Sequence, residues 1–545
     1  MKKRKLIVPS FLLIIIVLLS LAMLPLKGQT AGDDYFYAYS VKKTIETGTI
    51  QIPEASTAAS VFPIVWALIF SSLLGFSYET LHISTLIFLP VVLITSYYLL
   101  KQFKLDSHKA IFGSLFFISN PYFFQFAYTF LTDFPFLTLE LLAILFFTLG
   151  LKNDRTKNLF IGSVFSTIAF LSRQLGLFFV AGALLATVLR RENIPIAKKI
   201  VRVFILLIVP VTTITFYVYF FKEGTVSQHN LGKTIGNSID ALLFLRSTQS
   251  GLSQWSRVIY VSLEFIWSAF GFFSLFTIAF ILSNLKRYSS KKMILPLFVS
   301  LTLFTILVAF EKLVYMDKTF LGFPLVLYRY ESFLPIPWAH VWKYLVMTSF
   351  VFVSMETLMN FKSFKITKSS LFLIISFVLV LAATAITPVN HKKYVLPLLP
   401  FFLIYIAYLS RRLRLSGLIA IPILLLVLVD SLQMAKLRYD TNALAQKKAM
   451  ILVNNGISID NVLPNLEYTW SLWYTIDDKY AQALKKAGGD KLKVKYPVTP
   501  DKQQYQIISK ENLKYEKLPS KYYFIENSPF NSMFVSSYLL TIKKI

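Results

Sequence analysis

The sequence begins with Lys2-Lys3-Arg4-Lys5, continues with the apolar run Leu6–Leu26, and then reads Gly32-Asp33-Asp34-Tyr35-Phe36-Tyr37. The apolar run is about as long as one crossing of a bilayer requires. It ends in Leu24-Pro25-Leu26, which is not a small-residue cleavage site, so we interpret it as an uncleaved first span rather than a signal peptide. Because basic residues favour the cytoplasmic side, the N-terminus is predicted to be cytoplasmic and the two aspartates extracytoplasmic.

The composition indicates an integral membrane protein. Of 545 residues, 55% are hydrophobic and 15% are charged, and the mean hydropathy is +0.60. The net charge of 56 − 28 = +28 lies mostly in short loops between apolar runs, so it indicates a bilayer partner and no nucleic acid. The chain has no cysteine, which excludes disulfides and thiolate chemistry, and its five histidines form no HExxH zinc motif.

The spacing of apolar runs predicts a polytopic bundle of about 13 transmembrane helices. The segment Phe62–Gly75 is short for a span, and we expect it to lie in the interface within a long first outer loop. After the first span, the predicted crossings are 82–100, 110–126, 134–151, 159–171, 177–189, 200–220, 258–282, 294–310, 339–359, 371–386, 395–409 and 418–432.

The basic residues support this assignment of the loops to alternate sides of the membrane. They concentrate in alternate loops that carry at most one acid each, as the positive-inside rule requires of cytoplasmic loops. These loops contain Lys101/Lys104/Lys109, Lys152/Arg155/Lys157, Arg190/Arg191/Lys198/Lys199, Lys286/Arg287/Lys291/Lys292, Lys362/Lys365/Lys368 and Arg411/Arg412/Arg414. The loops between them are longer, contain most of the acids and are predicted to be extracytoplasmic.

The chain changes character after residue 433. The tail is polar and rich in Lys and Tyr, with helix-like runs at 443–453 and 480–487 and strand-like runs at 505–508, 522–525 and 539–542. An odd number of spans places this tail outside the cytoplasm. The predicted fold is therefore an all-α polytopic membrane bundle (1–433) with interfacial helices in its first outer loop, followed by a small extracytoplasmic α/β domain (434–545).

Three further features lie on the face that carries Asp33 and Asp34. Asp133 precedes the apolar run of the 134–151 span and could simply cap that helix. Arg173, in Ser172-Arg173-Gln174, could extend to lipid headgroups or meet an anion. Lys392-Lys393-Tyr394 places two cations at a helix start on a face that is otherwise poor in them, where they could bind headgroups or a ligand.

Taken together, these residues predict one group-transfer site. Carboxylates can orient and deprotonate an acceptor hydroxyl or amine, and fixed cations can hold a phosphate leaving group. The four features should then gather in one hollow on the extracytoplasmic side, and we expect the largest cavity there.

The same stretches resemble the integral-membrane glycosyltransferases of the GT-C superfamily. The resemblance rests on Gly32–Tyr37, Thr129–Pro135, Ser172–Gln174 and Lys392–Pro400, and it is strongest over 5–190. The most similar group is that of the dolichyl-phosphate-mannose protein mannosyltransferases and the lipid A aminoarabinose transferase.

The resemblance implies an inverting hexosyl or pentosyl transferase that uses a polyprenyl-phosphate-linked sugar. The acceptor, a protein, lipid or glycan, would approach from outside. Asp33 or Asp34 would be the general base and Asp133 the second acid. Arg173, Lys392 and Lys393, with Tyr394 beside them, would bind the donor phosphate.

Some points stay open at this level. The family often has Asp-Glu where this chain has Asp33-Asp34, so the resemblance does not assign the base to one of them. No cofactor is required for a monophosphate donor, because lysines can stabilise the departing anion. A divalent metal held by the acidic pair and Asp133 is the alternative.

Two other classes of protein compete with this interpretation. A polytopic transporter or flippase of lipid-linked sugars is the main alternative, although transporters usually place ionisable residues near the midplane and often have matching halves. The remaining alternatives are a sugar polymerase or ligase with a diphosphate-linked donor, and a scaffold built around the tail.

Overall fold

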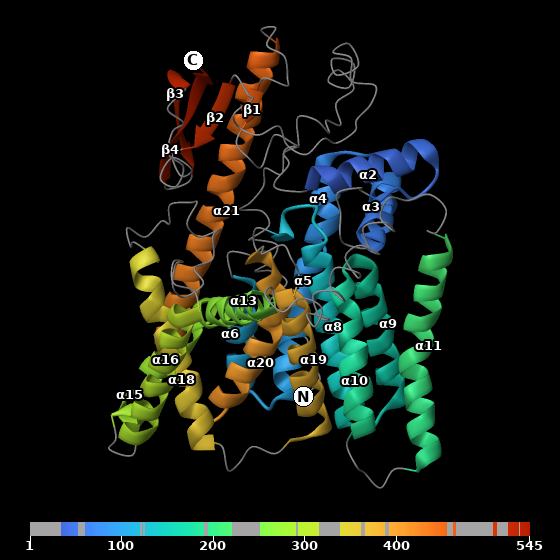
Figure 1. Cartoon of the computed structure of the whole chain (residues 1–545), viewed down its shortest axis with the longest axis vertical. Helices are drawn as coiled ribbons and strands as arrows, with labels where there is room; N and C mark the ends of the chain where they lie inside the picture. The colour runs from blue at the N-terminus through green and yellow to red at the C-terminus, as the bar shows by residue number, and fades with distance from the viewer. Residues whose placement is uncertain are drawn as a thin grey trace.

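The computed structural model describes residues 34–52, 60–119, 123, 126–189, 195–220, 251–289, 293–314, 338–360, 366–386, 392–454, 462–464, 505–509, 522–532 and 535–544 (Figure 1). The predicted first span, Asp33 and the helix-like run 480–487 lie outside these residues.

Helices make up most of the described chain. Their bounds are α2 (Asp34–Thr47), α3 (Val61–Leu74), α4 (Tyr78–Leu86), α5 (Phe88–Gln102), α6 (Ser107–Ile118), α8 (Asp133–Lys152), α9 (Thr156–Ser172), η1 (Gln174–Gly176), α10 (Leu177–Leu189), α11 (Ile196–Phe220), α13 (Gly251–Phe272), α14 (Ser274–Ser283), α15 (Leu285–Tyr288), α16 (Ile294–Val314), α18 (Trp338–Asn360), α19 (Lys368–Ile386), η5 (Lys392–Leu398), α20 (Leu399–Ser410) and α21 (Gly417–Asn454).

The helical bundle confirms a multi-pass membrane protein. Every predicted span from 82–100 onward overlaps a helix. Within the described ranges, four helices are long and apolar enough to cross a membrane, namely 78–102, 133–152, 196–217 and 368–385. The pair α13 and α14, bent by 48°, would be a fifth, and five shorter apolar helices accompany them. The predicted total of about thirteen crossings stays a prediction.

Helix α8 lies at the centre of the bundle. It packs against α9, α5, α19 and α10, and 83% of its most apolar window is buried. The corresponding value for α11 is 22%, and α11 lies at the edge of the molecule in Figure 1. Its exposed Phe204, Val211 and Phe216 are therefore suited to contact with lipid. The helix that begins with Asp133 is therefore enclosed by other helices over most of its length.

The basic loops meet at one end of the bundle around Asp154. The Asp154 carboxylate forms ion pairs with Lys198 and Arg202, at the start of α11, and with Lys368, at the start of α19. Arg202 and Lys368 are buried, so one carboxylate compensates two cations that have little access to water. This end is the one that the positive-inside rule assigns to the cytoplasm.

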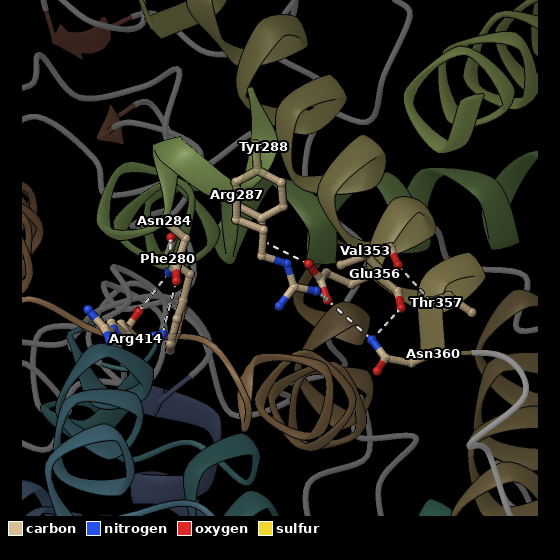
Figure 2. A network of polar contacts seen from close by, with 9 residues as sticks. All are labelled: Phe280, Asn284, Arg287, Tyr288, Val353, Glu356, Thr357, Asn360 and Arg414. Carbon is tan, nitrogen blue, oxygen red and sulfur yellow. Dashed lines mark hydrogen bonds and ion pairs between the residues drawn. The ribbon is translucent and has the colours of Figure 1, made fainter. Parts of the chain in front are cut away.

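A second polar network at the same end surrounds Glu356, as Figure 2 shows. Arg287 Nη2 lies 3.2 Å from Glu356 Oε2, and Tyr288 Oη donates to Glu356 Oε1 at 2.8 Å. Burial, followed by the nearby Glu356 carboxylate, raises the pKa of Tyr288 well above its usual value. Asn284 donates to the Arg414 carbonyl at 2.8 Å, which ties α14 to the loop before α21.

The tail combines a long helix with a sheet. The predicted domain boundary at residue 433 falls inside α21, which continues to Asn454 without a break. Strands β1 (Val462–Pro464), β2 (Tyr505–Ser509), β3 (Tyr522–Ser532) and β4 (Val535–Lys544) form a sheet in the order β1-β2-β4-β3, with β1 parallel to β2 and the other pairs antiparallel. The three predicted strands are confirmed. All four contact α21, and Figure 1 shows the sheet at the same end as α2.

We expect Asp154→Asn to lower the thermal unfolding temperature at neutral pH, because Lys198, Arg202 and Lys368 lose a shared counter-charge. Hydrogen bonds from Lys198 and then Arg202 lower the pKa of Asp154 to about 2. A depressed carboxylate pKa stabilises the fold above about pH 4, and this stabilisation disappears as the pH falls toward about 2. Thermal unfolding of both proteins in detergent should therefore differ at pH 7 and converge at low pH.

The ionic strength provides a check on this prediction. The Asp154 side chain is 43% exposed, so salt should also reduce the difference between the two proteins. A difference that neither acid nor salt changes would contradict the electrostatic explanation.

Candidate active site

Asp34 is the first residue of α2, and it is fully buried. An acidic residue in the first turn is favoured there because the N-terminal end of a helix carries partial positive charge. Asp34 Oδ2 lies 3.2 Å from Nε2 of His82, which is also fully buried. With Nε2 protonated, the imidazole donates to the carboxylate and fixes its orientation.

His82 is a site residue that sequence reasoning missed. It lies on α4, whose start is capped by Ser77, since the Ser77 hydroxyl accepts from the backbone N–H of Thr80 at 3.1 Å. Its Nδ1 is buried and has no hydrogen-bond partner in the described part of the chain. The available signal was its position at the first residue of a predicted span, where a titratable side chain is unexpected.

Asp133 and Arg173 form a buried ion pair between Oδ1 and Nη1. Their exposed fractions are only 3% and 8%, so each charge needs the other as a partner. Asp133 is the first residue of α8, and the capping position belongs to Thr132, so the alternative interpretation of Asp133 as an N-cap is not supported. Sequence reasoning placed both residues in one site but assigned them separate roles.

A tight turn positions Arg173. The residue ends α9 in an extended conformation, and the single turn η1 follows it at once. At Gly176 a Cβ would lie 2.2 Å from the backbone nitrogen of Phe170, so only glycine allows this turn to fold back against α9. The hydroxyl of Ser166 donates to the Gly176 carbonyl at 2.5 Å and holds the turn in place.

Apolar packing connects α2 to the Asp133–Arg173 pair. Ala38 and Val41 of α2 belong to one buried cluster with Phe130, three residues before Asp133, and Leu171 packs against this cluster. The backbone N–H of Ser60 also donates to the carbonyl of Ser172 at 3.3 Å. The structure therefore gathers Asp34, Asp133 and Arg173 around one cluster at one end of the bundle.

The predicted donor-binding residues Lys392, Lys393 and Tyr394 begin η5. Their side chains lie outside the described part of the structure, but the backbone of η5 contacts α8, α13 and α19. This contact places the segment beside the helix that begins with Asp133. The described side chains include no group of three or more His, Asp or Glu residues that could hold a metal ion.

A cavity of about 990 Å³ lies elsewhere. It opens at the basic end, between the loops that carry Lys104, Lys152 and Arg411. None of the predicted site residues lines it, and the expectation that the largest cavity surrounds the aspartates stays a prediction.

Part of the chain matches a known protein family. Residues 61–219 match the family of dolichyl-phosphate-mannose-protein mannosyltransferases. The predicted resemblance is confirmed over this segment, which contains His82, Asp133 and Arg173. Asp34 and Lys392–Tyr394 lie outside the matched residues. No curated protein matches the sequence.

Among solved structures, the chain is similar to ArnT from Cupriavidus metallidurans. For ArnT bound to undecaprenyl phosphate, the identity is 10%, the TM-score is 0.48, and the match covers 98% of this chain and 97% of that chain. For apo ArnT, the identity is 11% and the TM-score 0.47, with the same coverage.

We expect Gly176→Ala to destabilise the protein by on the order of 2 kcal/mol, because the new methyl group would overlap the backbone of α9. The same change should misplace Arg173. Gly417→Ala is the matched control, since a Cβ there would meet no atom within 4 Å. Thermal unfolding of the two variants should show a clear loss for the first and little change for the second, and equal behaviour would contradict the close approach.

Proposed function

We propose that this protein is a membrane glycosyltransferase that transfers a sugar from a polyprenyl-phosphate-linked donor to a protein, lipid or glycan acceptor on the extracytoplasmic face. The observation that carries the proposal is the family match over 61–219, combined with the Asp133–Arg173 pair inside that segment and the Asp34–His82 pair against it. Both pairs lie at the end opposite to the basic loops, where an extracytoplasmic acceptor would arrive.

The proposed reaction is a direct displacement. An aspartate carboxylate, Asp33 or Asp34, accepts the proton of the acceptor hydroxyl or amine. The acceptor oxygen or nitrogen then forms a bond to the anomeric carbon from the face opposite the phosphate, and the bond between that carbon and the phosphate oxygen breaks. The electron pair of this bond leaves with the polyprenyl phosphate, and the configuration at the anomeric carbon is inverted.

The cations are proposed to act on the leaving group. Lys392 and Lys393 would hold the phosphate as its charge develops, and Tyr394 would lie beside it. Arg173 is already paired with Asp133, so its share in phosphate binding depends on that pair opening or on a second N–H of the guanidinium, which has five. Asp133 then acts on the site by orienting Arg173.

His82 is proposed as a positioning residue for Asp34. A buried imidazole that donates to a carboxylate restricts the carboxylate to one orientation and, if Asp34 is the base, helps to present its free oxygen to the acceptor. Because Nδ1 of His82 has no partner among the described residues, it could also take part in the removal of the proton.

A transfer assay with purified protein, a radiolabelled polyprenyl-phosphate sugar and membrane extract as acceptor tests the site. The variants are Asp33→Asn, Asp34→Asn and Lys393→Ala. Loss of the general base should reduce kcat by about 100-fold or more. Lys393→Ala should raise the KM for the donor as well. His82→Asn should lower kcat with little effect on the donor KM, because His82 acts through Asp34.

Glu46→Gln is the matched control for the aspartate variants. Glu46 is an exposed carboxylate at the other end of α2, paired only locally with Lys43, and its loss should leave turnover unchanged. Unchanged turnover in all three site variants would remove the proposed site. Robust flux of sugar or lipid in reconstituted vesicles, without transfer to an acceptor, would favour a transporter.

We expect the transfer activity to persist in excess EDTA. Asp34 and Asp133 each contact a histidine or arginine, and a monophosphate leaving group can be stabilised by lysines alone. The measurement is the transfer rate before and after chelation. Mg²⁺ or Mn²⁺ is then added back to see whether the rate recovers. A rate that EDTA abolishes and one of these ions restores would show that the acidic residues hold a metal instead.

A further inference from the structure

The cavity at the basic end is the strongest feature that the proposed transfer reaction does not use. Its volume is about 990 Å³, and α8, α19 and α20 with their adjoining loops supply its walls. Among the described residues, five basic ones and no acidic one line it, and the basic ones are Lys104, Lys152, Lys368, Arg411 and Arg412. Such an excess of one sign favours an anionic occupant.

Three of the five basic side chains keep their charges accessible to solvent. Lys104, Lys152 and Arg412 are exposed. Arg411 stacks over the ring of Tyr408, with 3.8 Å between the guanidinium carbon and the ring centroid, so its position is fixed. Lys368 is buried and lies 3.7 Å from Asp154. An anion at this rim would meet several cations at once.

Apolar side chains supply much of the rest of the cavity lining. Leu373, Ile374 and Phe377 of α19 line it together with Phe401 and Phe402 of α20. Ile374, within the predicted span 371–386, is 44% exposed, so protein does not fully cover the apolar lining at membrane depth. A hydrocarbon chain could therefore enter from the membrane without crossing water.

A hydroxyl group adds a directed polar contact. Thr148 lines the cavity and is 1% exposed, yet its Oγ1 has no hydrogen-bond partner in the described part of the chain. A buried hydroxyl without a partner costs free energy unless a ligand or water satisfies it. The start of α19, which includes Thr367 and Ser370, also lines this wall, and a helix start favours an anion.

From these observations we propose that this cavity binds an anionic glycerophospholipid of the cytoplasmic leaflet. The headgroup phosphate lies among Lys104, Arg411 and Arg412, and one acyl chain lies along Leu373 and Phe377. The volume is within the range of ligand pockets and is sufficient for a headgroup and the upper part of a chain. A zwitterionic lipid would leave the excess of positive charge uncompensated. This site is separate from the aspartate site and independent of the proposed reaction.

The test compares lipid binding by the full-length protein and two charge-matched variants in native mass spectrometry. Phosphatidylglycerol and phosphatidylcholine with identical acyl chains are the probes. Lys104→Gln/Arg412→Gln should bind phosphatidylglycerol about tenfold more weakly, because each basic residue near the headgroup contributes to the attraction. Lys157→Gln/Arg414→Gln removes the same charge at the same end but outside the cavity, and it should leave binding unchanged.

A third variant tests the apolar half. Leu373→Trp keeps the charge and fills the cavity, so it should also weaken phosphatidylglycerol binding, and its thermal unfolding in phosphatidylcholine checks that it is folded. Equal losses in both charge pairs, or no preference for phosphatidylglycerol over phosphatidylcholine, would overturn the proposal. Displacement of the lipid by excess glycerol phosphate would identify a free phosphate compound as the occupant and would overturn it too.

Discussion

The hydrocarbon of a bilayer offers no partner for a backbone N–H or C=O, and the rest of this structure depends on that constraint. Each long apolar segment must satisfy its own polar groups, and it does so as a helix. The most enclosed helix, α8, begins with a buried aspartate and ends with a lysine, and it also carries the fully buried Glu140 in its middle, whose carboxylate oxygens have no hydrogen-bond partner among the described residues. The ion pairs of the candidate site and of the basic loops lie at the ends of the bundle, where loops and short helices can hold them.

The two ends use charge in different ways. At the basic end, Asp154 and Glu356 are single carboxylates surrounded by cations and polar side chains, which they hold together. At the other end, Asp34 and Asp133 are buried carboxylates that contact His82 and Arg173. The first arrangement stabilises loops, and the second keeps charged groups ready at positions that water scarcely reaches.

Sequence reasoning predicted the helices well, because long apolar runs allow only one backbone solution in lipid. It also predicted that Asp34, Asp133 and Arg173 share one face, because the alternation of basic loops indicates which turns lie on the same side. The direct contact between Asp133 and Arg173 could not be predicted, since it depends on how the turn at Gly176 folds back against α9. His82 was missed for a related reason, because a lone histidine has no sequence pattern.

The hydropathy pattern also did not predict how far α21 extends. The apolar run ends at Leu432, but the residues that follow include Ala435, Leu437, Ala443 and Ala445, which favour a helix in water as well as in lipid. The cavity at the basic end could not be predicted, because its walls come from residues between 102 and 412 that only the packing of α8, α19 and α20 brings together.

The unbroken helix α21 has a mechanical consequence. Its 38 residues correspond to a rod of about 57 Å, at a rise of about 1.5 Å per residue, that is rooted in the bundle and reaches the sheet. The rotation of α21 about its own axis therefore determines the orientation of the sheet. One extra residue in it would turn the sheet by about 100° about the rod axis and expose a different edge of the sheet.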